Sequence, residues 1–229
     1  MQVKPIHTRI FKEGENLESF VVEHVPAISD ATILVVTSKI VALSEKRTAD
    51  VARRDEIIKQ ESDVAIRTKY TWLTIKDGTV MSSAGVDESN ADGKLVLLPK
   101  DSFAAAEALR SALVRRFGLT KFGVVITDSR VLPLRAGIVG VALGYAGIKG
   151  VRDYRGTPDI FGRILKLART DVADSLATAA VLEMGEGAEQ RPLCIIEDAP
   201  VEFVDTIDRT ELHIDIEDDL YRPLFDTLN

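Results

Sequence analysis

Apolar runs and amphipathic segments alternate along this chain, and the alternation predicts a protein that mixes helices with strands. Short runs rich in β-branched and other large apolar residues are typical of buried strands, and they occur at residues 3–10, 31–36, 70–75, 94–98, 122–127 and 193–196. Segments whose apolar residues recur at helical spacing occur at residues 17–25, 55–68, 102–117 and 170–184. We therefore expect an α/β (mixed α+β) fold with mixed or antiparallel sheets and flanking helices.

Several of these elements carry signals at their ends. Asp101 or Ser102 can cap the helix that follows, and Gly118 can end it. A hydroxyl in Thr37-Ser38-Lys39 can cap a helix after the strand at residues 31–36. The apolar run at residues 137–148 contains four glycines, which predicts a strand that another part of the chain approaches closely.

The length and composition are those of an ordinary globular protein. At 229 residues the chain can form one large domain or two small ones. We find no internal repeat and no low-complexity linker, so we treat residues 1–229 as one unit, which can contain two subdomains without a visible boundary. The net charge of −7 argues against partners such as nucleic acid or an anionic membrane surface.

The location expected from the sequence is the cytoplasm. No apolar run is long enough to span a bilayer, and we expect no secretory signal at the N-terminus. The single cysteine, Cys194, cannot form an internal disulfide, which is consistent with a reducing compartment. The three histidines, His7, His24 and His213, are isolated and do not have the spacing of a zinc site.

Three polar segments are candidates for chemistry. The loop at residues 84–90 contains Asp87, Glu88 and Asn90, whose oxygens can hold a hard cation or form a solvated turn. Ser38-Lys39 follows a buried strand and can meet a phosphate or simply cap a helix. Asp128-Ser129 follows the strand at residues 122–127, where α/β proteins place ligands but where turn-forming acids are also common.

A fourth polar segment combines arginine with aspartate after the glycine-rich strand. It contains the sequences Arg152-Asp153-Tyr154-Arg155 and Asp159-Ile160-Phe161-Gly162-Arg163. The guanidinium groups can form ion pairs that hold a loop together, or they can bind a carboxylate substrate in a bidentate manner.

Taken together, the motifs resemble those of the coenzyme F420-0:L-glutamate ligase family. The matching segments, spread from about Val3 to Ile196, are Ser38-Lys39-Ile40-Val41, Ala84-Gly85-Val86-Asp87-Glu88-Ser89-Asn90, Ile126-Thr127-Asp128-Ser129, Asp153-Tyr154-Arg155-Gly156, Asp159-x-Phe161-Gly162-Arg163, Ala173-Asp174 and Met184-Gly185-Glu186. The resemblance implies a ligase that joins L-glutamate to a deazaflavin phospholactate and uses GTP (or ATP) with Mg²⁺ or Mn²⁺. It also implies an intertwined homodimer of mixed α/β fold.

The resemblance assigns roles to individual residues. It implies catalytic roles for Asp87, Asp128 and Glu186, and it implies the divalent-metal ligands Asp87, Asp128, Ser129 and Glu186. The nucleotide contacts that it implies are His7, Thr8, Arg9, Ile10, Ser38, Lys39, Asn90, Met184, Gly185, Gly187 and Arg191. The residues suggested for substrate binding are Arg135, Arg152, Asp153, Arg155 and Arg163.

The sequence departs from the family pattern near the expected nucleotide. A lysine usual in the family is Leu43 here, so that Lys46 or Arg47 would have to replace it. Three activities therefore stay open: glutamate ligation to F420-0, ligation to another carboxylate such as a folate-like pterin or an oligoglutamate chain, and nucleotide binding by a regulator without catalysis.

Overall fold

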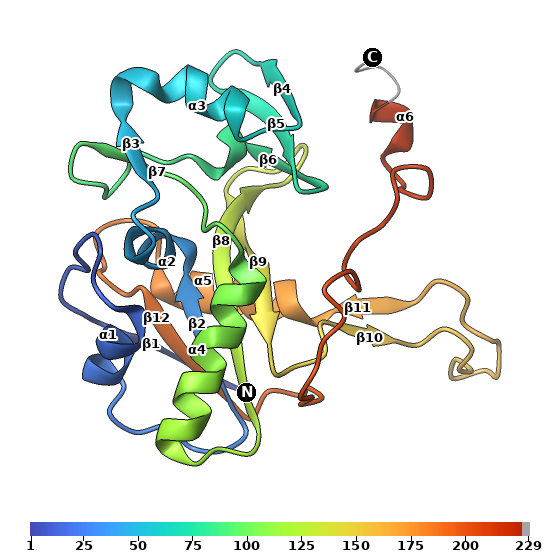
Figure 1. The fold of residues 1–229 in the computed structure, drawn as a ribbon. Coiled ribbons are helices and arrows are strands. Elements are labelled where there is room, and N and C mark those ends of the chain that lie inside the picture. Colours follow the sequence, from blue (N-terminus) through green and yellow to red (C-terminus); the bar gives the residue numbers. More distant parts are fainter. Residues whose placement is uncertain (226–229) are drawn as a thin grey trace.

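The computed structural model describes residues 1–225, and a five-stranded mixed sheet forms the centre of the molecule (Figure 1). In sheet order the strands are β1 (Gln2–Ile6), β12 (Leu193–Glu197), β2 (Thr32–Thr37), β8 (Phe122–Val131) and β9 (Ile138–Ala146). Only β2 and β8 pair in parallel, and the other neighbours are antiparallel. The mixed sheet expected from the sequence is therefore confirmed.

Helices cover both faces of this sheet, so that its central strands are buried on both sides. Helices α1 (Leu17–His24), α2 (Ser38–Ser44) and α4 (Ser102–Phe117) pack on one face, where Leu34, Val36, Val124 and Ile126 contribute to the core. Helix α5 (Val172–Met184) packs on the other face against Ile33, Val35, Val125 and Cys194. The alternation of core residues along β2 explains why its sequence is a continuous apolar run.

A smaller unit of short elements lies next to the end of the long β8–β9 hairpin (Figure 1). Its elements are β3 (Thr48–Asp50), η1 (Val51–Arg53), α3 (Arg54–Gln60), β4 (Val64–Arg67), β5 (Trp72–Lys76), β6 (Thr79–Ser82), η2 (Ser83–Gly85) and β7 (Lys94–Val96). It has its own apolar core around Ile58, Trp72 and Leu95. The chain enters and leaves it through the antiparallel pair of β3 with β7.

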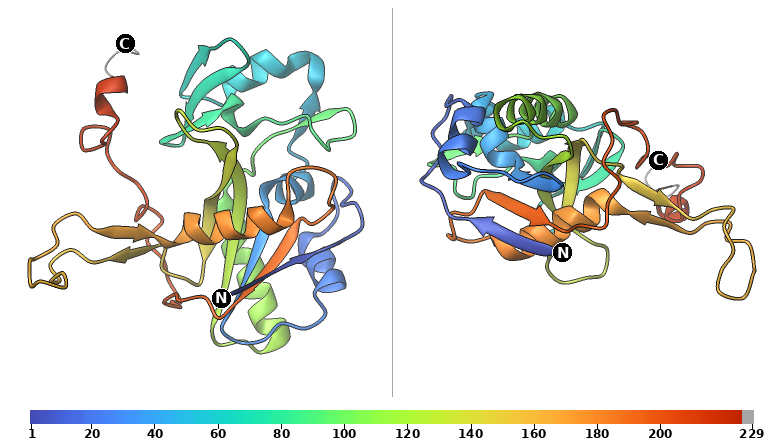
Figure 2. Two further views of the ribbon diagram at one scale, coloured as in Figure 1. Left: turned by 180° about the vertical axis from the view of Figure 1, so that it is seen from behind. Right: turned by 90° about the horizontal axis from the view of Figure 1, so that it is seen from below.

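Two further segments extend from the body (Figure 2). The first, which we call the arm, is the hairpin of β10 (Val151–Asp153) and β11 (Arg169–Asp171) with the long connection between them. The second is the C-terminal segment, which ends in α6 (Arg222–Phe225). It is held to the body where the Tyr145 hydroxyl donates a hydrogen bond of 2.7 Å to Glu211.

The ends of the two longest helices follow the sequence signals. The Asp101 carboxylate accepts a hydrogen bond from the Ala104 N–H at the start of α4, and Gly118 ends the helix in the left-handed conformation. The glycines of β9 also behave as expected. A Cβ on Gly140 would lie 2.4 Å from the Ala177 carbonyl oxygen of α5, and one on Gly144 would lie 2.5 Å from the Phe103 nitrogen of α4.

Several expected boundaries are wrong. The helix expected over residues 55–68 ends at Gln60, and Val64–Arg67 forms β4 because these residues pair with β5. The first strand ends at Ile6 and not at residue 10. No side-chain hydroxyl caps α2, whose N-cap residue is Thr37. Asp128, Ser129 and Arg130 lie inside β8, which continues to Val131 by pairing with β9.

None of the helices within residues 1–225 has both the length and the apolar character that crossing a membrane requires.

Candidate functional site

A cleft of about 750 Å³ lies between the central sheet and the smaller unit. Four segments form its walls: residues 8–13 after β1, the start of α2, residues 85–98 around β7, and residues 184–192 at and after the end of α5. Thr127, Asp128 and Ser129 of β8 form part of its surface. A cleft of this size suits a small-molecule ligand.

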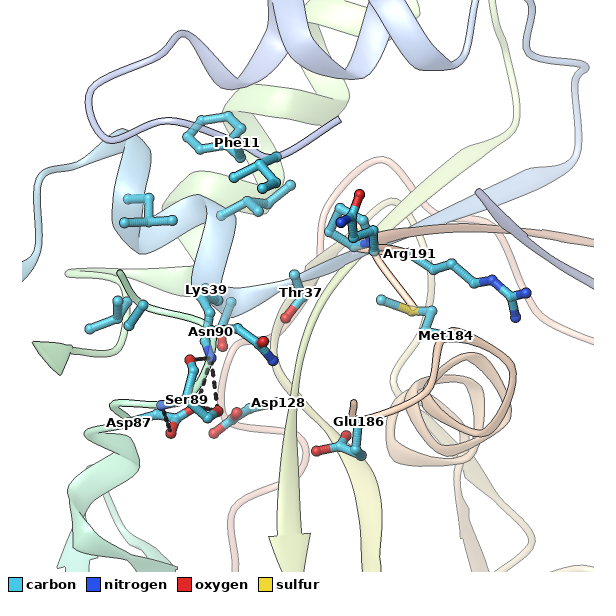
Figure 3. Close-up of a pocket in the computed structure, with 18 of the residues that line it drawn as sticks. Phe11, Thr37, Lys39, Asp87, Ser89, Asn90, Asp128, Met184, Glu186 and Arg191 are labelled. Carbon is cyan, nitrogen blue, oxygen red and sulfur yellow. Dashed lines mark hydrogen bonds and ion pairs between the residues drawn. The ribbon is translucent and has the colours of Figure 1, made fainter. Parts of the chain in front are cut away.

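The loop at residues 85–90 holds Asp87 through a dense set of hydrogen bonds (Figure 3). The Lys39 ammonium donates to Asp87 Oδ2 at 2.6 Å, and the Ser89 hydroxyl donates to the same oxygen at 2.7 Å. The Ser89 N–H donates to Asp87 Oδ1 at 2.9 Å. Burial alone would raise the pKa of the Asp87 carboxyl, but these bonds together outweigh it and hold the pKa below its usual value.

Asp128 has a cation of its own. Arg130 lies two residues further along β8, and its Nη1 donates to Asp128 Oδ2 at 2.6 Å. The Arg130 side chain is only 6% exposed, and its Nε and Nη2 atoms have no hydrogen-bond partner among the residues that the structure describes. Unpaired buried donors lower the stability of the folded state. The position of Arg130 therefore costs stability while it places a positive charge beside the Asp128 carboxylate.

Glu186 completes a group of three carboxylates at this end of the cleft. It follows Gly185, which ends α5, and in the view of Figure 3 Asp128 lies between Asp87 and Glu186. Burial raises the pKa of Glu186, and the charges of Asp128 and Asp87 raise it further, while a hydrogen bond with Ser129 and the Lys39 charge oppose the rise. Glu186 is therefore close enough to Asp128 and Asp87 to be repelled by both carboxylates.

The donor atoms at this end suit a hard divalent cation, because carboxylates and a hydroxyl are the ligands that Mg²⁺ and Mn²⁺ prefer. The four residues that the sequence analysis expects to hold the cation, Asp87, Asp128, Ser129 and Glu186, all line the cleft. Within residues 1–225, however, no three His, Cys, Asp or Glu side chains are grouped closely enough to hold a metal ion as they stand. Asp87 and Asp128 are instead paired with Lys39 and Arg130.

The structure brings together nearly all the residues predicted to contact a nucleotide. The predicted residues that line the cleft are Thr8, Arg9, Ile10, Ser38, Lys39, Asn90, Met184, Gly185, Gly187 and Arg191. His7 is exposed and is not among the lining residues. These residues come from four separate parts of the sequence, and only the fold places them on one cleft.

Arg9 lines the cleft, but its guanidinium is already fully used. It donates five hydrogen bonds, to Glu15, Glu23 and the Ile10 carbonyl, which is as many as it has N–H groups. The hydrogen bonds that Arg9 donates to Glu15 and, to a smaller extent, to Glu23 raise the pKa of Arg9. In this arrangement Arg9 fixes the loop after β1 to α1, and it has no free donor for a ligand.

Backbone and side-chain bonds join the loops around the cleft. The Asn90 amide donates to the Gly187 carbonyl at 3.1 Å, which links the loop of Asp87 to that of Glu186. The Thr8 N–H donates to the Gln190 carbonyl at 3.0 Å, and Lys94 pairs with Glu13 at 2.5 Å. The segments that form the walls of the cleft are therefore bonded to one another, although they lie far apart in sequence.

The residues suggested for substrate binding lie elsewhere. Arg135 follows β8, and Arg152, Asp153, Arg155 and Arg163 belong to the arm; none of the five lines the cleft. Asp153 accepts hydrogen bonds from Arg155, which lower its pKa to about 2. Arg152 donates to the Pro200 carbonyl. Within one chain Arg155 therefore binds Asp153, and Arg152 binds the nearby backbone.

The expected replacement for the missing lysine is not in the cleft either. Leu43 lines the cleft, but Lys46 and Arg47 do not. Arg47 donates to the Leu98 carbonyl and to Glu61. The ammonium groups of the cleft come from Lys12, Lys39 and Lys94.

The sequence analysis overlooked two groups at this site. The first is Ser89, which binds both Asp87 and Lys39. Ser89 lies in the same motif as Asp87, but the sequence analysis gave it no role. The second, Arg130, directly follows the Asp128-Ser129 pair, and the alternation of side chains along a strand would have placed Arg130 and Asp128 on one face.

Comparisons with known proteins give a consistent result. The sequence model of the family described as F420-0:Gamma-glutamyl ligase matches residues 50–198. A Coenzyme F420:L-glutamate ligase of Methanocaldococcus jannaschii is 31% identical over 89% of this chain and 90% of its own length. Proteins of the same name from Methanococcus maripaludis and Methanopyrus kandleri are 37% and 39% identical, over 73% and 66% of this chain and 67% and 60% of their own lengths.

Proposed function

Because the chain belongs to the F420-0:gamma-glutamyl ligase family, a family of amide-bond-forming enzymes, we propose that it adds L-glutamate to coenzyme F420-0 with the help of a nucleotide and a divalent metal. The observation that carries this proposal is the convergence of Asp87, Asp128 and Glu186 with Lys39 at one end of a cleft large enough for a nucleotide.

The proposed reaction has two steps. The terminal phosphoryl group of GTP or ATP is transferred to the acceptor carboxylate, which gives an acyl phosphate and a nucleoside diphosphate. The glutamate amine then attacks the acyl carbon, the amide bond forms, and phosphate leaves. A bound Mg²⁺ or Mn²⁺ supplies positive charge that neutralises the phosphate oxygens. No protein nucleophile is required, so the protein acts by positioning and electrostatics.

Residues of the cleft have distinct parts in this proposal. Asp87, Asp128, Ser129 and Glu186 hold the metal, and Lys39 reaches the phosphate groups. Phe11 lies across the cleft from the carboxylates (Figure 3), and with Leu43 and Leu98 it offers an apolar surface to an aromatic ring. Asn90 and the loop at residues 184–191 close the wall between these two ends.

One assay distinguishes the candidate activities. The protein is incubated with GTP or ATP, Mg²⁺ or Mn²⁺, L-glutamate and one acceptor at a time, and the products are identified by mass spectrometry. Addition of glutamyl units to F420-0 supports the proposal. Addition to a pterin or to oligoglutamate shows a ligase with another acceptor. Nucleotide binding without turnover on any acceptor shows a regulator, the activity that Leu43 in the cleft leaves open.

We also propose that the chain forms a homodimer through the arm. The arm exposes large apolar side chains, with Ile160, Phe161 and Leu167 at 91, 89 and 88% exposure. Large apolar side chains exposed to this extent on one segment are typical of an interaction surface. A second copy would cover them and would bring Arg152, Arg155 and Arg163 against another chain.

Replacing Phe161 by aspartate is expected to shift the protein from dimer to monomer, because a charge in an apolar interface is desolvated without a partner. Light scattering after gel filtration measures the mass. The control is Tyr70→Asp, which introduces the same charge at a site 82% exposed in the smaller unit. An unchanged dimer in Phe161→Asp would show that the arm does not form the interface.

A further inference from the structure

The Lys39 ammonium is bound entirely to the loop of Asp87. Its Nζ donates to Asp87 Oδ2 at 2.6 Å, to the Ser89 carbonyl at 2.5 Å and to the Ser89 hydroxyl at 3.3 Å. An ammonium has three N–H donors, so none is left for a ligand in the cleft. In this state Lys39 cannot also bind a phosphate.

The same contact, with the Ser89 hydroxyl, fills both acceptor positions of one oxygen of Asp87. Oδ2 accepts from Lys39 and from the Ser89 hydroxyl, and Oδ1 accepts from the Ser89 N–H. A divalent cation bound to Asp87 would have to replace the ammonium or lie beside it, where the two positive charges repel. Lys39 therefore stands where a metal ion would compensate the Asp87 charge.

The two internal cations of the site differ in their freedom to move. Arg130 is 6% exposed and lies within β8, so the fold holds it against Asp128. Lys39 is 23% exposed, lines the cleft, and carries its charge on a flexible four-carbon stem. A phosphate group in the cleft can attract the Lys39 ammonium away from Asp87, whereas Arg130 stays in place.

We propose that Lys39 occupies the cation position at Asp87 in the free protein and leaves it when a nucleotide phosphate binds, so that nucleotide and divalent cation bind cooperatively. The inference rests on the proposed use of a nucleotide and a metal. Transfer of the ammonium to the phosphate removes the Lys39 hydrogen bond from Asp87 Oδ2 and leaves an acceptor position there for the cation. The coupling is reciprocal by linkage.

The test measures Mn²⁺ binding to the full chain by electron paramagnetic resonance, with and without a non-hydrolysable GTP analogue. The signal is corrected for the complex that Mn²⁺ forms with the analogue in solution. The wild-type protein is expected to bind Mn²⁺ roughly tenfold more tightly with the analogue, within the usual range of allosteric coupling. Lys39→Met is expected to bind Mn²⁺ about five- to tenfold more tightly than wild type without nucleotide, and to lose the coupling.

Three variants make the result specific. Asp87→Asn is expected to lose Mn²⁺ binding, which shows that the signal reports this site. Lys39→Arg keeps the positive charge and is expected to keep the weak Mn²⁺ binding of the free protein. Lys76→Met is the matched control: Lys76 is 16% exposed and pairs with Glu61 at 3.0 Å outside the cleft, so its loss is expected to leave Mn²⁺ binding unchanged. Circular dichroism shows whether each variant is folded.

Failure of the inference and failure of the proposed function give different results. Equal Mn²⁺ affinity of folded Lys39→Met and wild type without nucleotide, with binding still lost in Asp87→Asn, would overturn the role of Lys39 and leave the metal site standing. Equal Mn²⁺ affinity of the wild type with and without bound analogue would also overturn it. Absence of any analogue or Mn²⁺ binding to the wild type would instead reject the proposed function.

Discussion

Turnover is expected to fall by about a thousandfold when Asp87 is replaced by asparagine. Asparagine keeps the shape of the side chain, and its Oδ1 can still accept the hydrogen bond from the Ser89 N–H, but it lacks the charge and its amide nitrogen cannot accept from the Ser89 hydroxyl. Only the carboxylates of Asp128 and Glu186 would then remain at the site, and we expect the site to lose its divalent cation. Steady-state assays with the best acceptor, over a range of Mn²⁺ concentrations, measure the effect, and Asp128→Asn is expected to behave in the same way.

The adjacent residue supplies the control for Asp87. Glu88 carries the same charge in the same loop, but it is exposed and does not line the cleft. Glu88→Gln is therefore expected to keep wild-type turnover and wild-type dependence on Mn²⁺. Near-normal activity in a folded Asp87→Asn protein would show that the metal site has been placed wrongly.

Gly140→Ala is expected to lower the free energy of unfolding by about 2–4 kcal/mol, a large effect for a single added methyl group. A Cβ at this position would lie 2.4 Å from the Ala177 carbonyl oxygen and 2.7 Å from Val181 Cγ2. Both atoms belong to α5, which packs directly on β9, so the helix or the strand has to shift. Since Glu186 follows the end of α5, turnover is expected to fall as well.

Urea denaturation followed by circular dichroism measures this loss of stability. The control is Ile138→Ala on the same strand, where the side chain is 40% exposed and its truncation is expected to cost less than about 1 kcal/mol. A Gly140→Ala protein as stable as the wild type would show that α5 can move away from β9 at little cost. The packing of this helix would then not fix the position of Glu186.

Local sequence patterns predicted correctly those elements whose type does not depend on contacts with other segments. The runs at residues 31–36 and 122–127 are strands because both faces of the sheet are covered, so an uninterrupted apolar sequence is enough to identify them. Helices α4 and α5 end at Gly118 and Gly185, as the sequence indicates. Residues 62–67 are the opposite case. Their apolar spacing also fits a helix, and only pairing with β5 makes Val64–Arg67 a strand.

The sequence by itself determined the types of group at the site: carboxylates at Asp87, Asp128 and Glu186, and a lysine at residue 39. These groups could be identified because each of them lies in a short sequence motif that can be recognised without the fold. Only the tertiary structure decided which charges meet. Lys39 binds Asp87 across 48 residues, and Arg9 is saturated by Glu15 and Glu23 rather than free for a ligand. Such pairings depend on distances set by packing between segments remote in sequence, and no local pattern contains them.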